Sequence, residues 1–127
     1  MAKSFRELKV WSKSIDLTEL IYLLTADFPK AEMYGLTAQM RRAAISISSN
    51  IAEGSARNTK KDFKQFIAIA RGSTCELLTQ LVIASRLALG SKSKIEEAEM
   101  LANEVSRMLS GLHDYLATPK PNSTTNN

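Results

Sequence analysis

Basic residues are concentrated in the middle of the chain, where they could hold the phosphate groups of a polyanion. Between positions 41 and 71, seven lysines and arginines face two acids, Glu53 and Asp62, whereas the whole chain carries a net charge of +4. Cationic side chains contact nucleic-acid backbones largely without regard to sequence, and such binding weakens as salt rises. The candidates, expected to cluster at the turn between the second and third predicted helices, are Arg41, Arg57, Lys60, Lys61, Lys64 and Arg71.

A second polar set follows one line of a predicted helix. Its members recur at intervals of three and four residues, which places them on one narrow arc of the helix. Amides, a hydroxyl and opposite charges in a row can hydrogen-bond along the helix or across to a partner. We expect a structural polar network that orients helices within the fold or at a subunit contact, formed by Gln39, Arg42, Ser46, Asn50 and Glu53.

Residues suited to catalysis are few. His113 is the only histidine and Cys75 the only cysteine, and they lie far apart in the sequence. A buried, inert thiol in a reducing cytosol is the expected state of the cysteine. No metal-ligand set, Gly-rich phosphate loop or nucleophile accompanies the polar cluster around Glu53. We therefore expect no enzymatic activity, no cofactor and no metal site.

The aromatic residues Trp11, Phe63 and Phe66 occur at the spacing of a helical core stripe. Rings in a core pack against other side chains and are unavailable to nucleic-acid bases. A stacking platform would need an exposed ring beside the basic groups. We interpret these three residues as packing residues.

Four amphipathic helices must position these groups. We expect them at about 4–27, 36 to between 54 and 58, 60–89, and from a Ser93–Glu96 capping box through Leu116. Phe28-Pro29 stops the first helix, Thr59 caps the third and Gly90 closes it. Short connections favour antiparallel neighbours, so the prediction is an all-α, up-down-up-down four-helix bundle. It forms one domain, 1–118, followed by a disordered polar tail, 119–127.

The apolar residues exceed what one small bundle needs. The first predicted helix carries two apolar lines, whereas a helix in a monomeric bundle needs one such face. A wide core contact is the alternative explanation, but the doubled pattern favours a second interface with another subunit. The subunit-contact candidates are Trp11, Tyr22, Ile45, Ala52 and Ile69.

The beginning of the chain mixes charge with apolar residues, unlike a signal peptide. We also expect no run of about 18 apolar residues that could span a bilayer. These features predict a soluble, cytoplasmic protein without a membrane partner.

Several short motifs carry a family resemblance. They are Phe5, Leu8, Val10 and Trp11; Phe28-Pro29 with Glu32 and Tyr34-Gly35-Leu36; Gln39, Arg41-Arg42-Ala43-Ala44 and Ser46; Asn50-Ile51-Ala52-Glu53-Gly54; Phe63, Phe66 and Ala70; and Gly72-Ser73 with Glu76-Leu77. Together, from position 5 to about position 89, the chain resembles the four-helix bundle proteins encoded within intervening sequences of 23S ribosomal RNA genes.

The resemblance implies a closed homo-oligomeric ring, a pentamer in related proteins. It also implies a relation to the accessory proteins of diversity-generating retroelements, bundles that associate with a reverse transcriptase and bind nucleic acid through a basic surface. The first functional hypothesis is therefore a non-catalytic oligomeric accessory or scaffold protein, with RNA or DNA and a reverse transcriptase or another protein as partners. The alternative is a protein-interaction or structural module without a nucleic-acid role.

Overall fold

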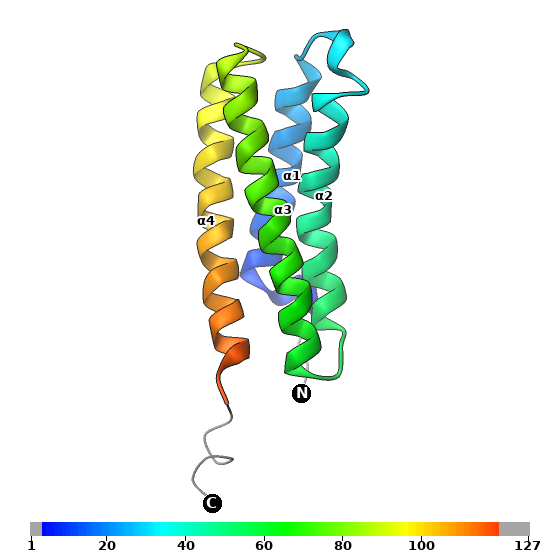
Figure 1. Cartoon of the computed structure of the whole chain (residues 1–127), viewed down its shortest axis with the longest axis vertical. Helices are drawn as coiled ribbons and strands as arrows, with labels where there is room; N and C mark the ends of the chain where they lie inside the picture. The colour runs from blue at the N-terminus through cyan, green and yellow to red at the C-terminus, as the bar shows by residue number, and fades with distance from the viewer. Residues whose placement is uncertain (1–3, 120–127) are drawn as a thin grey trace, which may run out of the picture.

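Four long helices dominate the computed structural model, which describes residues 4–119 (Figure 1). In chain order the elements are the 3-10 turn η1 (Phe5–Glu7), α1 (Lys9–Ala26), the 3-10 turn η2 (Lys30–Glu32), α2 (Leu36–Ser55), α3 (Lys60–Arg86) and α4 (Lys92–Ala117). The described residues contain no strand. The prediction of an all-α protein with four helices is confirmed.

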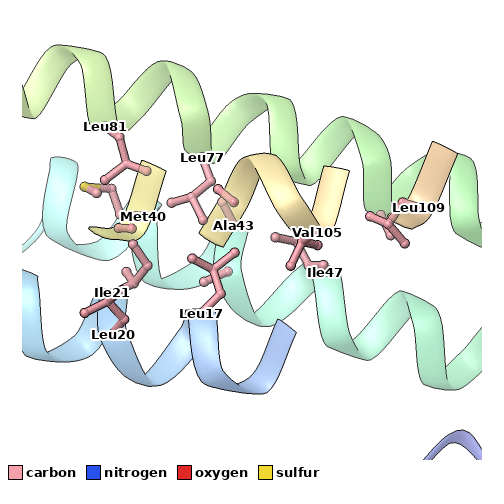
Figure 2. Close-up of a cluster of buried hydrophobic side chains, with 14 of the residues drawn as sticks. Leu17, Leu20, Ile21, Met40, Ala43, Ile47, Leu77, Leu81, Val105 and Leu109 are labelled. Atoms are coloured by element: carbon pink, nitrogen blue, oxygen red, sulfur yellow. The ribbon is translucent and has the colours of Figure 1, made fainter. Parts of the chain in front are cut away.

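The helices lie side by side along the long axis of the molecule, and short connections join consecutive helices at its ends (Figure 1). Helix α1 packs against α2 and α4, and α3 packs against the same two helices from the other side. Each helix contributes a stripe of apolar side chains at helical spacing, and these stripes meet in one core. Figure 2 shows its centre, where Leu17, Met40, Leu77 and Val105 come from four different helices.

Local side-chain chemistry sets the helix starts. Thr59 caps α3 as predicted, because its Oγ1 accepts a hydrogen bond of 3.1 Å from the backbone N–H of Asp62. The predicted cap of α4 is wrong by two residues, because Ser91 caps this helix and its Oγ accepts from the backbone N–H of Lys94 at 3.3 Å. The first predicted helix is also divided, because Leu8 adopts extended backbone between η1 and α1.

Helix α3 ends with a Schellman motif that the sequence did not predict. The backbone N–H of Leu89 donates to the Ala84 carbonyl at 2.9 Å, and that of Ala88 donates to the Ser85 carbonyl at 3.1 Å. Ala88 therefore takes the left-handed conformation, with a φ of 55°, that usually falls to glycine. Gly90 does not close α3 as predicted; it has a φ of 70° in the connection that follows.

The expectation that no segment is apolar enough to span a bilayer is wrong for α3. By length and composition alone, this helix is long and apolar enough to cross a membrane, as core helices of soluble proteins also can be. Its stripe of Ile67, Ala70, Leu77 and Leu81 is fully buried in the bundle. The predicted disordered tail, 119–127, lies outside the described residues except for Pro119 and stays a prediction.

Candidate nucleic-acid interface

Four basic residues gather where α2 passes into α3, at the lower end of the bundle in Figure 1. Arg57 follows the last turn of α2, and Lys60, Lys61 and Lys64 lie in the first turns of α3. Asp62 is the one acid among residues 57–64. We call these four cations the basic end. Their position on a turn and a helix start keeps most of them in solvent, where they can reach a partner.

Two of these cations lie over aromatic rings. The guanidinium of Arg57 lies 4.7 Å from the centre of the Phe66 ring, and Nζ of Lys60 lies 4.9 Å from the centre of the Tyr115 ring. Arg57 also lies 3.8 Å from the Glu53 carboxylate, but both side chains are about half exposed and such pairs contribute little to stability. The rings orient these cations without neutralising them.

An open hollow of about 500 Å³ lies between the basic end and the last turns of α4. Leu8 and apolar side chains of α3 and α4 form much of its lining. Among residues 4–119, the charged residues that line it are Arg57 and Lys60. The residues that line this end pocket are Leu8, Ser55, Arg57, Asn58, Thr59, Lys60, Phe63, Leu112, Tyr115 and Leu116. An apolar cavity with a few polar groups at its rim is the usual form of a ligand site.

Arg41 does not lie with the basic end as we expected. It sits in the second turn of α2, so about 24 Å of helix separates it from Arg57 at 1.5 Å per residue. There its Nε donates to Oγ1 of the buried Thr25 at 2.9 Å, and its guanidinium lies 4.4 Å from the centre of the Tyr22 ring. Arg71 is also remote, about 16 Å along α3 from Lys60. Helical geometry therefore leaves four of the six candidates together.

The predicted polar network divides into an inner and an outer part. Ser46 and Ser73 join α2 to α3 through a hydrogen bond of 2.8 Å between their hydroxyls. Asn50 Nδ2 donates to the Ser46 carbonyl at 2.8 Å and to its Oγ at 3.0 Å. By contrast, Gln39, Arg42 and Glu53 are exposed.

A polar groove of about 460 Å³ runs beside this network between α2 and α3, and it is lined by Gln39, Arg42, Ala43, Ser46, Ser73 and Glu76. Gln80 lies one turn beyond Glu76, and its Nε2 donates to Glu76 Oε2 at 3.4 Å. The buried Gln80 Oε1 has no hydrogen-bond partner in the described structure. The sequence did not predict this buried amide.

The subunit-contact candidates are partly exposed. Tyr22, Ile45 and Ile69 are exposed, with Ile69 at 52%. Ala52 is half-buried. Trp11 is also half-buried; it packs against the core, and its ring centre lies 5.1 Å from that of Phe5. An apolar hollow of about 640 Å³ on α1 is lined by Ile15, Thr18, Glu19, Tyr22 and Leu23.

Two residues differ from the expectations drawn from the sequence. Cys75 is exposed rather than buried, because it points away from the α3 stripe that contacts α2 and α4. Tyr115, absent from the sequence-based candidates, is an exposed ring beside the basic end. Among residues 4–119 no group of three or more His, Cys, Asp or Glu side chains could hold a metal ion.

The comparisons with known proteins agree with the fold. A crystal structure of a protein of unknown function from the S23 ribosomal protein family, from Bacteroides thetaiotaomicron, superposes with a TM-score of 0.71. The match covers 86% of this chain and 99% of that chain at 20% identity, so it shows a shared fold. A search of the curated proteins gave no match. The family model described as 23S rRNA-intervening sequence protein matches residues 6–111, and the chain therefore belongs to the 23S rRNA-intervening sequence protein family.

Proposed function

We propose that this chain is the subunit of a non-catalytic oligomeric accessory or scaffold protein that binds RNA or DNA through the basic end. The single observation that carries the proposal is the gathering of Arg57, Lys60, Lys61 and Lys64 at one end of the bundle, where Arg57 and Lys60 also line a hollow to which residues 4–119 contribute no acid. Four neighbouring cations produce a stronger local positive potential than the same charges spread over the surface, and this potential favours a polyanion. The family name makes a structured RNA the first ligand to test.

The subunit in this proposal is an antiparallel, up-down-up-down bundle in a closed cytoplasmic homo-oligomer, with five subunits by analogy with related proteins. Exposed apolar side chains on α1, α2 and α3, including Tyr22, Ile45 and Ile69, support a contact between copies. In a cyclic assembly each subunit presents its basic end to the same side, so phosphate contacts multiply around the ring. Binding that is weak for one subunit is then strong for the whole assembly.

The test measures binding of a fluorescent structured RNA by anisotropy over a range of salt concentrations. The triple variant Lys60→Gln, Lys61→Gln, Lys64→Gln should bind much more weakly. Its slope of log affinity against log salt should become shallower by roughly 2.1 to 2.7 per subunit engaged, because each of the three lost phosphate contacts removes roughly 0.7 to 0.9.

A matched control removes the same charge at the other end of the bundle. Arg86, Lys92 and Lys94 flank the α3–α4 connection, far from the basic end (Figure 1). The variant Arg86→Gln, Lys92→Gln, Lys94→Gln should keep nearly full affinity and slope. Equal losses in both triple variants would show that binding follows net charge and would overturn the assignment of the basic end.

The second candidate is a protein-interaction or structural module without a nucleic-acid role. The exposed apolar residues favour it, because an apolar surface suits a protein partner such as a reverse transcriptase or another copy. Wild-type protein that binds neither RNA nor DNA at low salt, yet co-purifies with a defined protein, would support this candidate over the first.

A further inference from the structure

We propose that the end pocket binds one unpaired nucleobase, stacked on Tyr115, while Arg57 and Lys60 hold the adjoining phosphates. The inference rests on the proposed function and names its ligand more narrowly, as single-stranded nucleic acid. It is carried by an exposed aromatic ring, a hollow of suitable form and a pair of cations at one place.

Tyr115 is the exposed aromatic ring that the basic end supplies. The residue is 63% exposed although Lys60 Nζ lies 4.9 Å from its ring centre. The residue thus remains accessible to a flat ligand although this cation lies over its ring. Every nucleobase has a π-face, so stacking on tyrosine tolerates sequence but requires the base to be unpaired.

The pocket also matches the remaining parts of a nucleotide. Phe63, Leu112 and Leu116 give it an apolar wall for a base that leaves water. Asn58 lies on the rim, and its amide has both a donor and an acceptor for the edge of a base. Arg57 and Lys60 give positive charge on the same rim, which suits the phosphates on either side of that base.

A duplex fits this arrangement poorly. Its bases are stacked on one another inside the helix, so their faces cannot stack on Tyr115, and the basic end would contact chiefly the phosphates. The structure therefore predicts a preference for single strands that charge alone would not produce, because a duplex carries the greater density of phosphate.

The test compares a fluorescein-labelled oligoadenylate with the same strand annealed to its complement, as RNA and as DNA. Tyr115→Ala should weaken single-strand binding about tenfold, since one base stacked on an aromatic side chain contributes on that scale, and should leave duplex binding unchanged. Tyr115→Phe should retain single-strand affinity because the stacking face remains. A difference between RNA and DNA would report a contact with the ribose hydroxyl.

Another tyrosine provides the matched control. Tyr34 is 97% exposed in the connection before α2 and is neither a subunit-contact candidate nor part of the end pocket. Tyr34→Ala should leave single-strand affinity within twofold of the wild type. Helical circular dichroism of each variant checks that the bundle is folded.

The outcomes separate this inference from the proposed function. Binding that depends on Lys60, Lys61 and Lys64 but not on Tyr115, or that is equal for single strand and duplex, overturns the base pocket and leaves the basic end in place. No binding of any nucleic acid overturns both. Photocrosslinking with a single strand that carries 5-iodouracil should modify Tyr115. Modification of Tyr22 or Tyr34 instead would also overturn the base pocket.

Discussion

Gly54 of α2 lies directly against Phe66 of α3. A Cβ added at Gly54 would lie 2.7 Å from the Cβ of Phe66 and 2.9 Å from Cδ1 of Phe63. The Phe66 Cβ is the root of its side chain and cannot rotate away, so a larger residue must push the two helices apart. The glycine of the Asn50–Gly54 motif thus fixes how closely α2 and α3 approach.

We expect Gly54→Ala to destabilise the protein by about 2 kcal/mol, because the cost of overpacking exceeds the gain in helix propensity. Urea unfolding at a fixed protein concentration measures the change. Gly111→Ala is the control, since a Cβ there meets nothing within 4 Å, and it should stabilise α4 by about 0.5 to 1 kcal/mol. Equal effects of the two substitutions would contradict the close contact.

Ala88→Gly should stabilise the protein by about 1 kcal/mol. Ala88 holds the left-handed position of the Schellman motif at a φ of 55°, and this conformation costs a non-glycine residue about 1 to 2 kcal/mol. Part of the gain is lost because glycine is more flexible in the unfolded chain. Thermal unfolding should show a higher melting temperature for the variant than for the wild type.

The reverse substitution, glycine to alanine, at Gly90 is the counterpart of Ala88→Gly. Gly90→Ala should destabilise by about 2 kcal/mol, because it adds a Cβ at positive φ and in a tight space. That Cβ would lie 2.8 Å from Cε1 of Phe28 and 2.9 Å from Cδ1 of Leu24. A stabilised Gly90→Ala variant would show that this connection can rearrange.

Arg41→Gln should lower stability by about 1 kcal/mol and leave nucleic-acid affinity unchanged. The substitution removes the hydrogen bond to Thr25 and the cation over the Tyr22 ring. Arg42→Gln is the matched control, because Arg42 is the next residue and is exposed; its effect should stay within about 0.5 kcal/mol. A loss of RNA affinity in Arg41→Gln alone would return this residue to the nucleic-acid interface.

Ile45→Asp and Ile69→Asp should each convert the assembly into smaller species. Both side chains are exposed on the bundle surface, so a carboxylate there spares the core but opposes an apolar contact between copies. Light scattering coupled to size-exclusion chromatography gives the mass. Met100→Asp is the control, since Met100 is exposed on α4 and is not a predicted contact. A wild-type protein that is monomeric would refute the assembly.

Periodicity predicted the four helices because apolar stripes are repeated over many turns, and one wrong residue changes little in such a pattern. The sequence did not predict some of the single residues at which helices begin or end. Ser91 and Ser93 are equally good caps by type, and only the backbone path selects Ser91. The left-handed Ala88 could not be predicted either, because a Schellman motif depends on which carbonyls remain free.

The candidate site was partly predictable for a related reason. Lys60, Lys61 and Lys64 are neighbours in the sequence, so their proximity needs only local structure. Tyr115 is distant in the sequence and reaches Lys60 only because α4 packs beside α3. Arg41 lies at the other end of α2 from Arg57, and charge alone does not predict this because it ignores the length of the helix between the two residues.

The exposed Cys75 gives each chain one accessible thiol near the middle of α3. A maleimide fluorophore would therefore label every chain once and at a known place. Particles fixed on a surface then lose fluorescence in discrete photobleaching steps, and the largest number of steps equals the number of chains per particle. The residue that we expected to be hidden thus allows the subunits to be counted directly.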